Sequence, residues 1–406
     1  MLALVQEYLL NHSLADLEIV HHVNGRTGSY KFSLNYDQIL SDDHDTLAME
    51  CRGLVLARKD GTVVRTEHEI VGETIVLAFP MRRFFNLGQS AAAKIDFSAE
   101  DVRYYEKEDG TLVIVYFDSF KDEWCVATRS VCEANLPIDR SPDLTFRTLF
   151  EQAVQKSTSL SFSEWTNLLV KGWTYCFELT TPLNQVVVAH YDFKVHLLTV
   201  RDLDSGQEAP NHKLEMIAKS LGVLLPVSYN FQSIDEMLAF VNARLGSEFE
   251  GLVVCDSNHN RVKIKSEAYL NASRIVSKMG ATDRNILEVV LMGQADDIYP
   301  ILPKYHQERL VMMQENVRSL ADYYNHKFFE LNGSLDSVYG TPEHRKQFAV
   351  TCNQLGLRMG TIMGMYVQGQ HPDFIGSLKQ KSGGGFTVSI LDVILEDIDK
   401  IVTKKV

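Results

Sequence analysis

The residues Lys107-Glu108-Asp109-Gly110 place a lysine where it could carry covalent chemistry. A strand-like segment ends at this lysine and the apolar run 112–116 follows it, so the four residues are predicted to form a turn between two strands. A lysine at such a turn can be a nucleophile once its amine is neutral. Asp-Gly is also a common hairpin turn, and the tetrapeptide by itself favours an ordinary β-hairpin.

A second pattern is the strict alternation in Arg261-Val262-Lys263-Ile264-Lys265. In a strand, Val262 and Ile264 would face one side while Lys263 and Lys265 face the other. Two cations about 7 Å apart on one face call for an anion such as a triphosphate. The alternative is an edge strand that carries lysine to prevent aggregation.

Two carboxylates stand singly inside apolar, strand-like runs, Glu178 after Phe177 and Glu250 after Phe249. Acids in such runs are seldom buried without a partner. A metal ion, a ribose hydroxyl or a nearby lysine ammonium would each explain them. A salt bridge within the sheet is the structural alternative.

Other polar clusters have weaker spacing. His21-His22 and Asp42-Asp43-His44-Asp45 are interpreted as solvated loops, because no further metal ligands occur near them. Asp296-Asp297 is a candidate cation site, although helix capping is the favoured interpretation. Residues 261–284 contain six basic residues against two acids, which predicts a local basic surface for phosphate binding.

The elements that must position these residues fall into two parts, predicted as domains 1–285 and 286–406. Short β-branched and aromatic runs, such as 53–56, 112–116 and 185–188, predict a mainly antiparallel sheet structure with helices near 146–155 and 234–245. Beyond residue 285, the segments 307–331, 342–366 and 390–402 have helical periodicity. The fold class is therefore α+β, with a C-terminal all-helical domain.

Composition narrows the function classes. The chain has 406 residues and a formal net charge of −13, which argues against a protein that coats nucleic acid over its whole surface. Six cysteines without a CxxC pair predict a reducing compartment. The sequence contains no run of about 18 apolar residues, so we do not expect a membrane-spanning helix. We expect a cytoplasmic protein that acts as a monomer.

The ordered motifs resemble those of the covalent nucleotidyltransferases, the superfamily of DNA ligases, RNA ligases and mRNA capping enzymes. Within it, the chain most resembles the bacteriophage RNA ligases of the tRNA-repair type over about residues 25–290. The motifs that carry this resemblance are Glu50-Cys51-Arg52-Gly53, Phe84-Phe85-Asn86-Leu87, Lys107-Glu108-Asp109-Gly110, Phe177-Glu178, Glu250-Gly251 and Lys263-Ile264-Lys265-Ser266.

The resemblance implies a nucleotidyltransferase domain whose antiparallel sheets form an ATP cleft. Lys107 would carry AMP, Glu178 and Glu250 would bind the ribose and the catalytic metal, Mg²⁺ or Mn²⁺, and Lys263 and Lys265 would hold the α-phosphate and take part in catalysis. The remaining nucleotide-binding positions that it implies are Glu106, Arg52, Arg83 and Val253. Arg83 stands where the family has a lysine, and Arg129 is either a further phosphate contact or a solvated strand residue.

Attack by Lys107 on the α-phosphorus requires a neutral amine, whereas free lysine has a pKa of about 10.4. Lowering this pKa to about 7 requires on the order of 4 kcal/mol. We expect Lys263, Lys265 and Mg²⁺ to supply the positive field that lowers it.

The resemblance further implies RNA ends with a 5′-phosphate and a 3′-hydroxyl as substrates. A nicked tRNA anticodon loop is the leading candidate, and an RNA end-healing enzyme is an expected partner. If the protein is phage-encoded, it would act in the host cell cytoplasm. The alternatives are a DNA ligase, an mRNA guanylyltransferase, or a noncatalytic nucleotide- or RNA-binding module that retains the fold.

Overall fold

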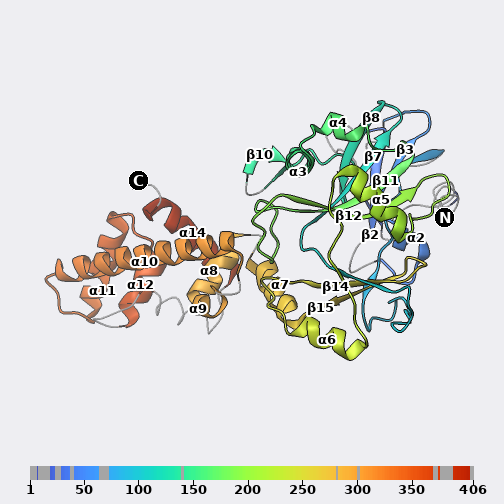
Figure 1. Ribbon diagram of the computed structural model, residues 1–406. Coiled ribbons are helices and arrows are strands. Elements are labelled where there is room, and N and C mark those ends of the chain that lie inside the picture. The colour runs from blue at the N-terminus through green and yellow to red at the C-terminus, as the bar shows by residue number, and fades with distance from the viewer. Residues whose placement is uncertain are drawn as a thin grey trace. The chain divides into compact units, whose positions relative to one another are not determined.

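The computed structural model describes residues 7, 19–22, 29–36, 41–63, 73–138, 141–279, 282–299, 302–368, 374 and 387–402. The chain divides into two compact units, Met1–Asn271 and Ala272–Val406 (Figure 1). The expected domain boundary, between residues 285 and 286, falls inside the second unit, within helix α8 (Asp283–Met292). Helix α8 packs against α10 (Lys304–Gly333) and α14 (Val388–Asp397), which explains why residues 283–285 cluster with the second unit.

Three main sheets build the first unit, and nearly all their strand pairs are antiparallel. The first has the order β1-β2-β3-β4, formed by Ile19–His22, Lys31–Tyr36, Arg52–Arg58 and Thr74–Ala78. The second has the order β12-β11-β7-β8, formed by Lys194–Asp202, Trp173–Thr180, Thr111–Asp118 and Glu123–Thr128. This mixed architecture agrees with the predicted α+β class.

The third sheet has the order β13-β6-β14-β15-β5 and carries the alternating strand noted in the sequence. Its strands are Ser228–Tyr229, Arg103–Glu106, Gly251–Cys255, Arg261–Lys265 and Phe85–Asn86, and only β15 and β5 pair in parallel. Val262 and Ile264 are buried in β15, whereas Arg261, Lys263 and Lys265 lie on its other face. The predicted alternation of this strand is therefore confirmed.

Helices cover the sheets of the first unit and complete their cores. The core of the second sheet joins β7, β11 and β12 to α3, α4 and α5, with Phe150, Trp165 and Phe177 fully buried. Helix α6 buries Met237 and Val241 against the third sheet. The bounds of these helices are Phe146–Thr158 for α3, Phe162–Thr166 for α4, Asn211–Leu221 for α5 and Ile234–Asn242 for α6, and the short α2 is Thr46–Glu50.

All the named secondary-structure elements of the second unit, within the described residues, are helices. Its helices are α8, α9 (Ala295–Ile298), α10, α11 (Pro342–Gln354), α12 (Met359–Gln368), α14 and the π-helical segment Ile398–Val402, while α7 (Glu267–Met279) spans the boundary between the units. The predicted helix over 342–366 is two helices, because Gly356 adopts a positive φ of 64° that ends α11. In the described parts of the chain, no helix is long and apolar enough to cross a membrane.

The prediction of a strand over residues 185–188 is wrong. The backbone amides of Val187 and Val188 instead donate hydrogen bonds of 2.7 and 2.6 Å to one carboxylate oxygen of Asp109. A side chain thus replaces the ladder partner that a strand would need, and the segment remains a loop beside Lys107.

Candidate functional site

Lys107 lies on a connection between two sheets, not in a hairpin. Strand β6 of the third sheet ends at Glu106, and β7 of the second sheet begins at Thr111. The Lys107 amide donates a 2.9 Å hydrogen bond to the carbonyl of Gly251, which fixes this end of the connection to β14. The hairpin alternative from the sequence is therefore wrong, because its two strands belong to different sheets.

The Asp-Gly pair secures the other end of this connection. Asp109 is 4% exposed, and its second carboxylate oxygen accepts a 2.7 Å hydrogen bond from the Tyr269 hydroxyl. A Cβ on Gly110 would lie 2.3 Å from the carbonyl oxygen of Leu179 in β11. Asp109 therefore ties the Lys107 segment to the loop at Val187 and Val188 and to Tyr269 in α7 (Glu267–Met279), and only glycine fits against β11 at position 110.

The carboxylate of Glu250 joins two lysines. Glu250 is 3% exposed, its Oε2 lies 2.8 Å from Lys107 Nζ, and its Oε1 lies 2.8 Å from Lys265 Nζ. The next residue, Gly251, has a φ of 153°, and a Cβ there would lie 2.0 Å from the carbonyl oxygen of Ile264. This close approach of β14 to β15 sets the depth at which Glu250 meets both lysines.

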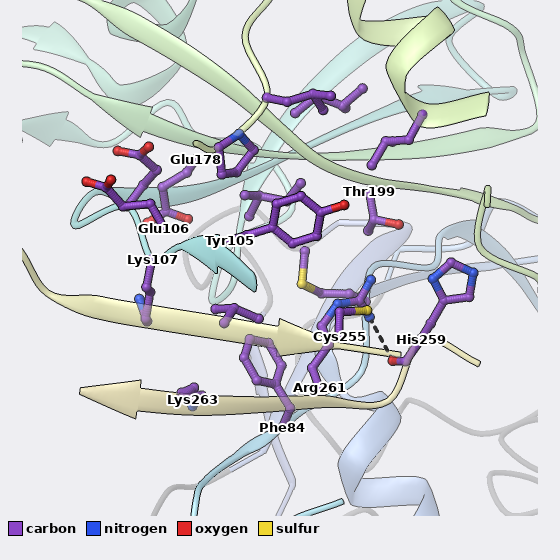
Figure 2. Close-up of a pocket in the computed structure, with 18 of the residues that line it drawn as sticks. Phe84, Tyr105, Glu106, Lys107, Glu178, Thr199, Cys255, His259, Arg261 and Lys263 are labelled. Atoms are coloured by element: carbon purple, nitrogen blue, oxygen red, sulfur yellow. Dashed lines mark hydrogen bonds between the residues drawn. The ribbon is translucent and has the colours of Figure 1, made fainter. Parts of the chain in front are cut away.

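Lys107, Glu178, Lys263, Lys265 and Arg52 line one pocket of the first unit. Figure 2 shows Lys107 and Lys263 toward one end of it, His259 at the other end, and Tyr105 between them. Two further residues implied by the resemblance, Glu106 and Val253, also line it. Val253 pairs with Tyr105 on one side and with Lys263 on the other, so adjacent strands present these three residues together.

The titration of the pocket differs from the sequence-based expectation. Burial by itself lowers the pKa of Lys107, but the carboxylates of Glu250 and Glu178 outweigh burial and raise it above 10.5. We expected Lys263 and Lys265 to lower the pKa of Lys107, and this is wrong when the side chains of the protein act alone. Lys265 is paired with Glu250, which leaves the two carboxylates dominant around Lys107.

Lys263 and Glu178 carry the perturbed protonation states instead. Burial, followed by the nearby cations Arg52, Lys107 and Lys265, lowers the pKa of Lys263 to about 7. Burial raises the pKa of Glu178 to about 7, although Lys107 opposes the shift. Both groups thus change charge near neutral pH, which is a feature of residues that handle protons or charged ligands.

Arg52 offers an unused donor to the same pocket. Its Nη1 is buried and has no hydrogen-bond partner among the described residues, and its guanidinium lies 5.1 Å from the centre of the Phe84 ring. Lys263 Nζ lies 4.9 Å from the same ring. Arg129, whose role the sequence left open, also lines the pocket, 5.6 Å from the Tyr36 ring. These cations suit an anionic ligand.

Sequence reasoning missed several lining residues, including Tyr36, Phe84, Thr199 and His259. Phe84 was recognised only as part of a motif. His259 has a positive φ of 60°, an uncommon conformation outside glycine, and no sequence pattern indicates it. Apolar side chains from β12, α5 and the loop before β13 complete the lining, and these are Leu197, Leu198, Leu214, Leu225 and Pro226.

Arg83 does not line the Lys107 pocket. Its Nη2 lies 2.8 Å from Asp43, and its guanidinium lies over the rings of Tyr36 and Phe85 at 4.2 and 4.7 Å. It lines a neighbouring pocket instead. Asp45 of the same acidic run caps α2 by accepting a hydrogen bond from the Ala48 amide, so this run is structural in the part described.

The remaining sequence candidates lie away from the pocket or outside the description. Asp296 is exposed in α9, and the side chains of Asp297, His21, His22 and Lys278 lie outside the described residues. Within the predicted basic stretch, Arg261, Lys265 and Arg284 are ion-paired with Glu208, Glu250 and Asp392. The count of basic residues in this stretch therefore overstates its free positive charge.

Comparison with known proteins matches residues 50–269 to the family model described as RNA ligase. A protein named as a bifunctional polynucleotide kinase/RNA ligase, from Autographa californica nuclear polyhedrosis virus, is 30% identical over 66% of this chain, which spans 37% of that protein's length. An RNA ligase from Rhodothermus phage RM378 is 24% identical over 74% of this chain and 77% of its own.

Solved structures with similarity to the chain are also RNA ligases. An archaeal ATP-dependent RNA ligase aligns over 87% of this chain and 90% of its own at 15% identity and a TM-score of 0.42. A Naegleria gruberi RNA ligase mutant with ATP and Mn aligns over 42% and 51% at 16% identity and a TM-score of 0.32.

Proposed function

Because this chain belongs to the RNA ligase family, we propose that it joins RNA ends through an AMP that Lys107 accepts from ATP. The observation that carries the proposal is the group formed by Lys107 Nζ, Glu250 and Lys265 Nζ, linked by two contacts of 2.8 Å, whose two lysines line a pocket together with Glu178, Lys263 and Arg52. Residues 1–285 would form the adenylyltransferase domain and 286–406 a helical domain.

In the first step, the neutral Lys107 nitrogen attacks the α-phosphorus of ATP. A nitrogen–phosphorus bond forms, the bond to the bridging oxygen breaks, and pyrophosphate leaves with that electron pair. The ammonium proton of Lys107 must first depart, and Glu250 Oε2 at 2.8 Å is the carboxylate positioned to receive it. Glu250 thus orients the nucleophile and is the nearest acceptor for its proton.

Cations of the same pocket would stabilise the negative charge on the phosphoryl oxygens. Lys263 and Lys265 point from one face of β15, and the unpaired Nη1 of Arg52 adds a donor. Charged donors placed where charge develops can account for a large part of a rate enhancement. The apolar lining from β12 and α5, with Val253 and Tyr105 on the third sheet, would hold the adenine, and Glu106 lies at the same wall.

The carboxylates fit a divalent cation such as Mg²⁺ or Mn²⁺ in one respect. Glu178 is partly buried with a pKa raised to about 7, and Glu250 contributes to that rise by repulsion, so a cation beside Glu178 would relieve an unfavourable charge. A bound cation would neutralise phosphate oxygens during transfer. Glu178 would also hold the ribose when ionised, and its Oε1 accepts a hydrogen bond from the Gly110 amide at 3.2 Å.

In the second and third steps, AMP passes from Lys107 to an RNA 5′-phosphate, and a 3′-hydroxyl displaces AMP to form the phosphodiester bond. A broken tRNA anticodon loop, prepared by an RNA end-healing enzyme in the host cytoplasm, is our preferred substrate, and the ligase would act as a monomer. Arg83 is left out of the nucleotide set, because it lines the neighbouring pocket and pairs with Asp43.

The test is incubation with α-labelled ATP and Mg²⁺, followed by 5′-phosphorylated single-stranded RNA or the matching DNA. We expect a labelled protein adduct from ATP and not from GTP, and joined or circular RNA. The adduct should vanish in Lys107→Met and persist in Lys171→Met, a matched change at a lysine that is 61% exposed and lies outside the pocket. An adduct that survives Lys107→Met would refute the proposal, and efficient joining of DNA alone would refute the substrate.

A further inference from the structure

A second pocket of the first unit lies directly beside the Lys107 pocket, and Phe84, His259 and Arg261 line both. Its lining includes Arg82 and Arg83 and contains no aspartate or glutamate. We call it the three-arginine pocket, after Arg82, Arg83 and Arg261. A pocket lined by guanidinium groups without acids is suited to an oxyanion.

The arginines around this pocket outnumber the carboxylates that pair with them. Three carboxylates, those of Asp43, Glu50 and Glu208, form ion pairs with these arginines, and none of the three lines the three-arginine pocket. Glu50 contacts Arg201 at 2.8 Å and reaches Arg82 only at 4.0 Å. Four guanidinium groups, those of Arg82, Arg83, Arg201 and Arg261, therefore share three ion-pair partners, and Arg82 has no carboxylate closer than 4.0 Å among the described residues.

One of these guanidinium groups has an unsatisfied donor. Arg83 is 9% exposed, and its Nη2 contacts Asp43, but its Nη1 is buried and has no hydrogen-bond partner among the described residues. A buried donor without a partner is costly unless a ligand accepts its proton. Arg82 is 39% exposed, and within the described part of the chain its Nη2 reaches only the weak acceptor Met49 Sδ at 3.5 Å.

A nearby pocket provides a contrast. It shares Arg82, His259 and Asn260 with the three-arginine pocket, but Glu50, Asp204 and Glu208 also line it. Carboxylates in a pocket wall weaken the attraction of an anion to the guanidinium groups there. The difference indicates that the absence of acids from the three-arginine pocket is local to that pocket.

We propose that the three-arginine pocket is a second phosphate-binding subsite, which takes a backbone phosphate of the RNA strand presented for joining. This inference rests on the proposed RNA-joining function and adds a binding site to it. Phosphate is the shared chemistry of two sources, the RNA backbone and the outer phosphates of ATP. The RNA is favoured because the Lys107 pocket already presents Arg52, Lys263 and Lys265 to a nucleotide.

The test uses Arg82→Gln, because Arg82 is the most exposed of the three arginines and its removal breaks no close ion pair. Binding of a 5′-phosphorylated single-stranded RNA is measured by fluorescence anisotropy from 50 to 200 mM salt. In a separate experiment, the KM for ATP is obtained from the rate of protein-adduct formation at a series of ATP concentrations. Arg82→Lys keeps the charge, and Arg147→Gln removes an arginine from α3 that lines none of these pockets.

The logarithm of the RNA affinity falls linearly with the logarithm of the salt concentration, and loss of one phosphate contact should make this slope shallower by about 0.7 for a single strand. Over a fourfold rise in salt, the parent should lose about 2.6-fold more RNA affinity than Arg82→Gln. Arg82→Lys and Arg147→Gln should keep the parental slope. The KM for ATP should change less than the RNA affinity does.

Two results would overturn the inference. An unchanged salt slope with unchanged RNA affinity would mean that the pocket binds no RNA phosphate. A raised KM for ATP with unaltered RNA binding would assign the pocket to the outer phosphates of the nucleotide instead. Neither result touches the proposed function, whose failure would appear as the absence of a Lys107 adduct in the parent protein.

Discussion

Replacement of Lys263 by methionine is expected to stabilise the first unit while it removes a residue of the proposed active site. Lys263 is partly buried on β15, and burial together with Arg52, Lys107 and Lys265 lowers its pKa from 10.5 to about 7. The folded state therefore binds the lysine proton more weakly than the unfolded chain does. This difference opposes folding whenever the unfolded lysine is protonated.

The size and pH dependence of the effect follow from the two pKa values. The destabilisation is complete below about pH 7, declines as pH rises, and vanishes above 10.5, the pKa of the unfolded lysine. At 1.36 kcal/mol per unit it amounts to about 4 kcal/mol at pH 7 and about 2 kcal/mol at pH 9. The stability gained by Lys263→Met should thus be about 2 kcal/mol larger at pH 7 than at pH 9.

Urea unfolding followed by tryptophan fluorescence measures this gain in the correct unit. All three tryptophans, Trp124, Trp165 and Trp173, lie within Met1–Asn271. Lys171→Met, at a largely exposed lysine, is the control and should show no comparable gain. A gain of equal size at pH 7 and pH 9, or a loss of stability at pH 7, would refute the electrostatic account of Lys263.

Three further predictions concern the neighbours of this lysine. Gly110→Ala should destabilise the first unit by roughly 1–3 kcal/mol and slow adduct formation, because its Cβ would lie 2.3 Å from the Leu179 carbonyl oxygen; normal urea stability would contradict this packing. Arg261→Met should lower the free energy of unfolding by about 3–5 kcal/mol, because it leaves buried Glu208 unpaired. The double variant Arg261→Met/Glu208→Met should recover most of this loss, which a double-mutant cycle in urea measures. Additive losses of the two single changes would argue against the ion pair. If ionised Glu178 is the active form, it should add a factor of about ten per pH unit to the rise of the rate of adduct formation below pH 7, and this added rise should end above pH 7. A profile unchanged in Glu178→Gln would exclude Glu178 as the titrating group.

Local patterns in the sequence were sufficient for much of the fold. The alternation in 261–265 correctly predicted which face of β15 carries the cations, because side chains of any strand alternate between its two faces. The periodicity of 146–155 and 307–331 predicted helices that the structure has as α3 and α10. Residues 342–366 were harder, because a break at Gly356 interrupts a pattern that continues on both sides.

The sequence by itself also determined which residue types could carry the chemistry, since Lys107, Glu178, Glu250, Lys263 and Lys265 were all named from their local context. Only the tertiary structure decided how they act on one another. It separated β6 from β7 into different sheets, gave Asp109 the amides of Val187 and Val188, and turned Arg83 toward Asp43.

The sign of the Lys107 shift shows the physical reason. Two carboxylates and several cations surround this amine, and they come from strands far apart in the chain. Their net effect depends on distances such as the 2.8 Å between Glu250 and each of its two lysines. Electrostatic energy depends on separation in space, which spacing along the sequence does not specify.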